Sequence, residues 1–177
     1  MCPGVASEPG SRVLPTQVPV TGYDNNGSSC TEPPTQAMST LLHRVKVFVY
    51  CMSRRQPKYL LLKRDHGIEA CWGPLQGPIE HGEKLESAIR REVMETTGIA
   101  PPRELIDLRM PVRWVVGDEE VVEWHFGFRT DDERRIADLD PCWSEFRWEQ
   151  FPAAYPSLEL EPDRAAIMRL HTLLGAA

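Results

Sequence analysis

The sequence predicts an α+β domain in which one amphipathic helix packs against a mixed β-sheet. The first observation is that runs rich in β-branched and aromatic residues lie on both sides of residues 83–97. The second is that apolar positions within 83–97 repeat with the period of an α-helix. The third is size: 177 residues, 41% of them hydrophobic and 26% charged, are enough for one domain with a real core.

The expected strands lie before and after this helix. They cover residues 45–50, 59–62, 105–116 and 121–128, with shorter extended pieces at 71–77 and 146–148. A turn is expected over 54–58, and Gly98 is a natural stop for the helix. An amphipathic helix over 163–174 is expected to close the chain. Strands interspersed with few helices and no internal repeat are typical of an α+β fold.

Residues 1–37 differ in composition from the rest of the chain. They are rich in Pro, Gly, Ser, Thr and Asn and poor in large apolar side chains. Such a segment buries too little apolar surface to offset its ordering entropy, so we expect a disordered tail. The folded domain is then expected over 38–177, and Met38, just before the first strand, is a candidate for the true start.

Charge and cysteine usage exclude several classes of function. The net charge is −6, which is unsuited to a nucleic-acid duplex but allows a small phosphorylated molecule bound through a cation. No apolar run is long enough to cross a bilayer, and the start of the chain does not resemble a signal peptide. We therefore expect a cytoplasmic protein with no membrane partner and five reduced cysteines. The sequence does not indicate an oligomeric state.

The phase of the helix over 83–97 places a carboxylate on its buried side. Leu85, Ala88, Ile89 and Val93 fall within one apolar arc of about 140°, at about 100° per residue. Glu92 falls inside this arc, whereas Glu95 falls at its edge. A charged run usually marks a solvated helix face, but a carboxylate on the buried side is costly unless a positive group meets it. Arg90, Arg91 or a metal ion could supply that charge.

The loop before the helix supports the metal alternative. Gly77 and Gly82 bracket a loop that presents Glu80 and Glu83 beside the helix N-terminus. Glycine permits a close approach of the backbone, so that a carbonyl oxygen can reach a metal ion. Carboxylate and carbonyl oxygens are the ligands that Mg²⁺ and Mn²⁺ prefer.

These residues resemble the Nudix family. The Nudix box is a glycine, five residues, Glu, seven residues, and then Arg-Glu-apolar-x-Glu-Glu-x-Gly-apolar. The chain matches it without a gap at Gly77, Glu83, Arg91, Glu92, Val93, Glu95, Gly98 and Ile99. Trp72 upstream and the run 144–148 downstream resemble further Nudix elements, so the likeness spans about 43–174. It implies the Nudix α/β/α sandwich, nearest to nucleoside and dihydroneopterin triphosphate pyrophosphatases.

The resemblance also implies roles for individual residues. Glu92 and Glu95 are expected to bind Mg²⁺ or Mn²⁺ together with the Gln76 backbone carbonyl, and Glu92 to orient the attacking water. Arg91 is expected to fix the carboxylates, with Glu83 either as its ion-pair partner or as a group that supports the metal ligands from behind. The implied reaction is metal-assisted hydrolysis of a nucleoside di- or triphosphate, or of another X-linked nucleoside diphosphate.

Two departures from the family pattern keep a second function open. Thr96 stands where the box has its second adjacent Glu, which removes one negative charge from the expected metal site. Cys142 and Trp143 stand where related enzymes have Glu-His, which removes a candidate base. The alternative is therefore a Nudix-fold module that binds a nucleotide or metabolite with weak catalysis or none. The candidates for a replacement base are Glu119, Glu120, Glu123, Asp138, Asp140 and Glu145.

Substrate-binding residues are less marked. Trp72 is a candidate for stacking on a base, although a tryptophan beside a core strand more often packs in the core. Arg64, next to Lys63, is a candidate for gripping phosphates, although surface solvation explains such residues equally well. Cys142 is not expected to act as a nucleophile, because no histidine partner is evident.

Overall fold

The computed structural model describes residues 40–66, 69–99, 102–131, 133, 139 and 141–175. The expected tail over 1–37 and the candidate start at Met38 lie outside these residues. The same is true of two candidate bases, Asp138 and Asp140. Among the described residues, no helix is long and apolar enough to cross a membrane.

Seven strands and three helices follow one another along the described chain. The first half contains β1 (Thr40–Ser53), β2 (Gln56–His66), β3 (Glu69–Gly73), β4 (Leu75–Pro78) and α1 (Leu85–Thr97). The second half contains β5 (Glu104–Val116), β6 (Glu119–Arg129), β7 (Trp143–Gln150), α2 (Phe151–Ser157) and α3 (Glu161–Leu173). The predicted α+β class is confirmed.

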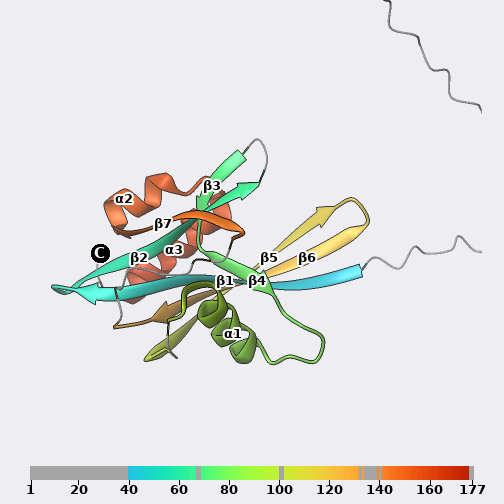
Figure 1. Ribbon diagram of the computed structural model, residues 1–177, viewed down its shortest axis with the longest axis horizontal. Coiled ribbons are helices and arrows are strands. Elements are labelled where there is room, and N and C mark those ends of the chain that lie inside the picture. Colours follow the sequence, from blue (N-terminus) through green and yellow to red (C-terminus); the bar gives the residue numbers. More distant parts are fainter. Residues whose placement is uncertain are drawn as a thin grey trace, which may run out of the picture. The chain divides into compact units, whose positions relative to one another are not determined.

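The strands form one mixed sheet. Its main path runs β3-β2-β1-β6-β5, while β4 pairs with β1 and β7 pairs with β2. The β1–β6 ladder is parallel, and the other ladders are antiparallel. Helix α1 lies on one side of this sheet, and α2 and α3 lie on the other (Figure 1). This is the α/β/α sandwich that the resemblance implied.

The central strand β1 supplies both cores, because successive side chains of a strand point to opposite faces. Val45, Val47 and Val49 are buried in the cluster that contains Ile89 of α1. Phe48 and Tyr50 are buried in the opposite cluster, which is completed by side chains of α2 and α3, among them Ala154, Leu158, Ala166, Ile167 and Leu170. The sheet is therefore fixed on both faces, and α1 is held at a defined height above β1 and β4.

The boundaries differ from the predictions in ways that have local causes. Helix α1 begins two residues later than predicted, at Leu85, and ends at Gly98, whose φ of 67° is left-handed as predicted. The β1–β2 turn is confined to Arg54 and Arg55, which both have positive φ, so the strands extend beyond the predicted runs. Helix α2 was not predicted, because Pro152 and Pro156 lie within its seven residues.

Candidate active site

The site is built where α1 meets β4. Glu92 is 8% exposed, and its carboxylate lies directly against Gly77 of β4. A Cβ built on Gly77 would overlap the Glu92 carboxylate. The glycine of the box is therefore required by this contact between the helix and the strand. We had expected it to let a backbone carbonyl approach a metal ion, and the structure gives the residue this additional reason.

Burial changes the chemistry of Glu92. It raises the pKa of the Glu92 carboxyl, and the hydrogen bond from Arg91 offsets this rise only in part. The charged form therefore lacks full compensation from the protein alone. A buried carboxylate in this state is a better proton acceptor than an exposed one, and a bound cation would stabilise it.

Arg91 connects the carboxylates around the site. Its Nε and Nη2 donate to the two oxygens of Glu83 at 3.0 and 2.8 Å, which is a bidentate pair. Its Nη1 donates to Glu92 Oε1 at 2.7 Å and to Glu95 Oε2 at 3.4 Å. Its Nη2 also donates to the Pro78 carbonyl at 3.1 Å. The expected contact between Arg91 and Glu83 is thus present.

These bonds set the ionisation of the pair. The hydrogen bond from Arg91 lowers the pKa of the Glu83 carboxyl, and the same bond raises the pKa of Arg91. Both groups are consequently charged across the physiological range. Arg91 thus connects the helix to the loop, and the hydrogen bond from its Nη1 goes to one of the two Glu92 oxygens, Oε1.

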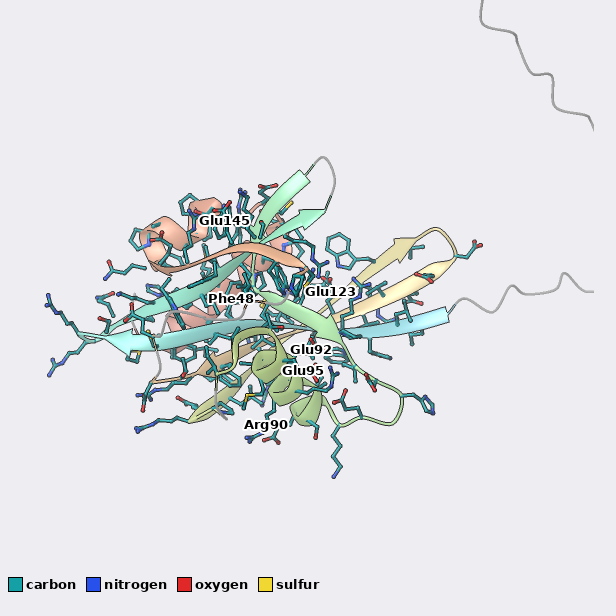
Figure 2. All side chains as sticks on the ribbon, in the orientation of Figure 1. Phe48, Arg90, Glu92, Glu95, Glu123 and Glu145 are labelled. Carbon is teal, nitrogen blue, oxygen red and sulfur yellow. The ribbon has the colours of Figure 1, made fainter. Side chains whose placement is uncertain are left out.

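Glu92 and Glu95 differ in exposure although both lie on α1 (Figure 2). The side chain of Glu95 is 63% exposed. Figure 2 shows Glu92 on the side of the helix toward the sheet and Arg90 on the side away from it. The predicted phase of Glu92 therefore agrees with the structure, and Glu95 reaches the site only from its solvent edge.

The Gln76 carbonyl faces away from β1. Ile79 N–H donates to the His43 carbonyl at 2.9 Å, so residues 43 and 79 form a hydrogen-bonded pair. Pairs alternate along an antiparallel ladder, and Lys46 and Gln76 are three register positions further on. They form a non-hydrogen-bonded pair, and the Gln76 carbonyl is left open to a ligand on the side away from β1.

A cleft of about 280 Å³ opens at this edge of β4. Glu92, Gln76, Gly77 and Thr96 line it together with Arg44, Arg64, Pro78, Cys142 and Trp143. Glu95 is not among the lining residues. Two arginines therefore face one glutamate here, and the cleft is suited to an anion.

Arg64 is held in place inside this cleft. Its guanidinium lies over the Trp143 ring, 5.0 Å from the ring centroid. With the Gln76 amide oriented to accept, the side-chain oxygen receives bonds from Arg64 Nη1 and Nη2 at 2.7 and 2.9 Å. The Arg64 Nε is buried and has no partner among the described residues. A guanidinium fixed in this way carries its positive charge at a defined place in the cleft, where it can attract an anion.

Thr96 and Cys142, the two residues that depart from the Nudix pattern at the expected metal and base positions, both line the cleft. Thr96 is 5% exposed and stands one helical turn after Glu92. Among the described residues, no three His, Cys, Asp or Glu side chains group closely enough to hold a metal ion. The donors that remain are the carboxylates of Glu92 and Glu95 and the Gln76 carbonyl. Glu92 and the Gln76 carbonyl offer oxygen donors of the type that Mg²⁺ and Mn²⁺ take, whereas Glu95 offers its carboxylate only from the solvent edge.

Trp72 does not line this cleft. It also does not line a second cleft, of about 630 Å³, that adjoins the first at Arg44 and Pro78. Its ring packs against the core on the α2–α3 side, and the Arg147 guanidinium lies 4.0 Å from its centroid. The structure thus brings Arg64 to the site but keeps Trp72 away from it.

The replacement bases that the structure describes lie elsewhere. Glu123 is buried, 3.4 Å from Lys46, and accepts a hydrogen bond from Trp114 at 2.7 Å. Glu145 is exposed and pairs with Lys63. Glu119 and Glu120 lie at the start of β6, and Glu120 accepts a hydrogen bond from Arg113. None of these four residues lines the cleft, so Glu92 is the one glutamate among the described lining residues.

Arg44 and Trp143 were not predicted as site residues. Arg44 is exposed on β1 opposite Pro78, and a single arginine in a strand carries no signal of its own. The Trp143 ring of β7 lies under the Arg64 guanidinium of β2. The two residues meet because they are register partners in the β2–β7 ladder. That pairing follows a register shift between Lys63 and Arg64, which the sequence does not mark.

The sheet, the glutamate-bearing helix and the cleft at its edge belong to one fold, and comparison with known proteins identifies its family. The family model for the NUDIX domain matches residues 42–171, so the chain belongs to this family. The family includes hydrolases such as the dihydroneopterin triphosphate pyrophosphohydrolase of E. coli. A comparison with curated proteins gives no match.

Solved structures share the fold. The dihydroneopterin triphosphate pyrophosphohydrolase of E. coli is 23% identical, with a TM-score of 0.62 over 76% of this chain and 96% of that one. The NUDIX domain of Shewanella oneidensis NrtR, complexed with ADP ribose, is 19% identical, with a TM-score of 0.64 over 81% and 94%. The C. elegans Ap4A hydrolase is 16% identical, with a TM-score of 0.61 over 77% and 99%. At these identities the similarity concerns the fold.

Proposed function

We propose that the protein hydrolyses the diphosphate linkage of a nucleoside di- or triphosphate, or of another X-linked nucleoside diphosphate, with Mg²⁺ or Mn²⁺. The observation that carries this proposal is the buried Glu92 carboxylate, which shares one cleft with Arg64 and Arg44. The arginines attract the phosphates, and the carboxylate is the group that can take a proton. The similar structures of a dihydroneopterin triphosphate pyrophosphohydrolase, of a NUDIX domain complexed with ADP ribose and of an Ap4A hydrolase support a phosphorylated small molecule as the substrate class.

The protein's own groups have separate tasks in this reaction. Arg64, fixed by Trp143 and Gln76, holds a phosphate and offsets the charge that develops on it. Glu92 orients a water molecule and accepts its proton as the water oxygen attacks phosphorus. The bond from phosphorus to the bridging oxygen breaks, and the electron pair leaves with the second phosphate. Arg91 keeps Glu92 in place through its contacts with Glu83 and the Pro78 carbonyl.

A divalent ion bound by Glu92, Glu95 and the Gln76 carbonyl would neutralise the diphosphate and lower the pKa of a bound water. Two carboxylates and one carbonyl are fewer protein ligands than the Nudix box usually supplies, because Thr96 replaces a glutamate. We therefore expect weak metal affinity in the free protein. Affinity should rise when a substrate contributes its phosphate oxygens.

The experiment is a measurement of phosphate or pyrophosphate release over a panel of nucleoside triphosphates, diphosphates and X-linked diphosphates. Release is expected with Mg²⁺ or Mn²⁺ and is expected to stop with chelator. Glu92→Gln should lower turnover by about 10²–10⁴-fold. Glu86→Gln is the matched control, because Glu86 is an exposed residue of the same helix that pairs with Arg90. A fully active Glu92→Gln enzyme, or activity that chelator leaves unchanged, would contradict the mechanism.

The second candidate is a binding module, and the charge of the cleft is the observation that favours it. A cleft with two arginines and one glutamate can bind an anionic ligand without a metal ion. Thr96 replaces one of the glutamates that the metal site of the family needs. The same panel separates the two candidates. A nucleotide that binds tightly with and without Mg²⁺, and is recovered intact, would identify a binding module.

A further inference from the structure

A second, larger cleft of about 630 Å³ adjoins the site. It lies between the first residues of β1, Trp124 of β6 and the loop that leads to α1. Its walls include Leu41, His43, Arg44, Ile79, Leu85 and Trp124. Its volume is within the range of small-molecule pockets. Its lining combines apolar side chains with polar ones, among them Glu80, His81 and Glu83 of the loop before α1.

Two rings form a platform in this cleft. The His43 and Trp124 rings are stacked, with centroids 6.3 Å apart and planes inclined by 22°. Trp124 Nε1 donates to His43 Nδ1 at 3.3 Å, which fixes the two rings relative to each other. Because Nδ1 accepts this bond, the neutral ring carries its proton on Nε2 and keeps one donor for a ligand. A fixed aromatic surface of this kind favours stacking by another planar ring.

The two clefts meet at one pair of residues. Arg44 and Pro78 line both clefts, and they are register partners across the β1–β4 ladder. Arg44 is exposed and has no ion-pair or hydrogen-bond partner among the described residues. A guanidinium without a partner at this border can bind a phosphate in the smaller cleft. A group attached to that phosphate would then extend into the larger one.

We propose that the larger cleft holds the planar heteroaromatic ring of the substrate, stacked on the Trp124–His43 platform, while its phosphates lie between Arg44 and Arg64. The proposal rests on the proposed function, because the phosphates are placed in the hydrolytic cleft. It adds two specificity residues, His43 and Trp124, that lie outside the box, in a cleft whose other wall is the box loop before α1. Trp124 then selects for substrates that carry a ring, and inorganic polyphosphates gain nothing from it.

The test measures binding without turnover. Adenosine and guanosine triphosphates with an α,β-methylene bridge, and tripolyphosphate as the probe without a ring, are titrated calorimetrically into the full chain with Mg²⁺. Trp124→Leu is expected to weaken binding of the ring-bearing probes by about 5- to 150-fold, the effect of losing one stacking contact. Binding of tripolyphosphate should be unchanged. Trp124→Phe should restore most of the lost affinity, because a phenyl ring still stacks.

The control is Trp148→Leu. Trp148 is a half-buried tryptophan that packs on the core and lines neither cleft. Its replacement by Leu therefore removes a tryptophan ring without changing either cleft lining. Melting temperatures of all variants show whether each one folds. Equal binding of the ring-bearing probes to wild type and to a folded Trp124→Leu would overturn the proposal, as would a wild type that binds tripolyphosphate but neither nucleotide.

Failure of this proposal and failure of the proposed function give different results. A protein that binds the methylene nucleotides through Trp124 but hydrolyses no natural nucleotide keeps the ring site and loses the hydrolase function. A protein that hydrolyses nucleotides with the same KM in wild type and Trp124→Leu keeps the hydrolase function and loses the ring site.

Discussion

The Glu92 carboxylate occupies the space next to Gly77 in which the Cβ of any other residue would lie. Helix α1 and strand β4 therefore pack closely at Glu92 and Gly77. The Glu92 carboxylate can occupy its position in the cleft only because residue 77 has no side chain. The contact couples the fold to the proposed chemistry, because Gly77 permits the close packing that positions Glu92, the proposed proton acceptor.

Gly77→Ala should displace Glu92 and reduce turnover strongly. The added methyl group would overlap a carboxylate that Arg91 holds from the other side, so α1 must shift or Glu92 must leave the cleft. We expect a loss of at least about 10²-fold in kcat, similar to the loss of an orienting catalytic group. The matched control is Gly73→Ala, whose Cβ would meet Asp163 at an ordinary 3.7 Å. Equal activity of the two variants would show that Glu92 tolerates displacement.

Glu92→Gln should stabilise the metal-free protein at neutral pH. A raised pKa means that the folded state favours the protonated carboxyl. The stability that this group contributes is present at low pH and is lost as pH rises through its folded pKa. Glutamine stays neutral, so the variant should exceed wild type near pH 8, and the difference should shrink toward about pH 4. Urea denaturation with chelator across this range is the measurement.

Glu86→Gln serves as the control for the pH series, since Glu86 is exposed and forms only an i,i+4 pair with Arg90. Its midpoint should follow wild type at every pH. A Glu92→Gln variant that is less stable than wild type near pH 8 would mean that the Arg91 pair outweighs the cost of burial.

Arg91→Lys should lower both stability and turnover, whereas Arg90→Lys should change neither. Arg91 makes a bidentate pair with Glu83 and also reaches Glu92 and the Pro78 carbonyl, which a single ammonium group cannot reproduce. We expect a loss of roughly 1–2 kcal/mol in the free energy of unfolding and a decrease in kcat. Arg90 lies on the same helix and pairs only with Glu86 in solvent. Similar denaturation midpoints for the two variants would contradict a structural role for the Arg91 contacts.

Lys46→Met should be among the most destabilising single changes on the opposite face of the sheet. Lys46 is 2% exposed, and its Nζ lies 2.9 Å from Asp163 of α3 and 3.4 Å from Glu123 of β6. Its removal leaves two buried carboxylates without their cation, which typically costs about 3–5 kcal/mol. The control is Lys58→Met, because the pair of Lys58 with Glu133 is partly exposed. A small effect of Lys46→Met on the urea midpoint would show that His125 or water compensates.

The sequence was sufficient for the parts of the fold and site that depend on short-range periodicity. The phase of Glu92, the stop at Gly98 and the strands on either side of α1 follow from patterns within a few residues. The contact between Arg91 and Glu83 was predicted from the family resemblance.

The remaining features depend on pairings between distant segments. Arg44 reaches the cleft because β1 pairs with β4, and Arg64 stacks on Trp143 because of a register shift in the β2–β7 ladder. Neither pairing can be read from local composition. Trp72 resembles a ligand-stacking residue in the sequence, but its strand directs it to the α2–α3 side of the sheet, where Arg147 covers it.

Thr96→Glu should tighten Mg²⁺ binding and raise turnover. Thr96 is buried in the same cleft as Glu92 and one helical turn away, so a glutamate there would add a second carboxylate around one ion. The two arginines in this cleft make the extra negative charge tolerable despite its burial. Calorimetric titration with Mg²⁺ and turnover at limiting Mg²⁺ are the measurements. Met94→Glu is the matched control, because Met94 is 47% exposed on the same helix and adds the same charge outside the cleft.

Combining Thr96→Glu with Cys142→Glu separates a missing metal ligand from a missing base. If the ion is the only deficiency, Thr96→Glu alone restores activity, and the second change adds little. If a base is also missing, Thr96→Glu improves Mg²⁺ affinity without turnover, and only the double variant gains activity, because Cys142 lines the same cleft. A wild type that already binds Mg²⁺ tightly and loses activity on Thr96→Glu would refute this explanation. The new carboxylate would then have paired with Arg64 and removed the guanidinium from the phosphate.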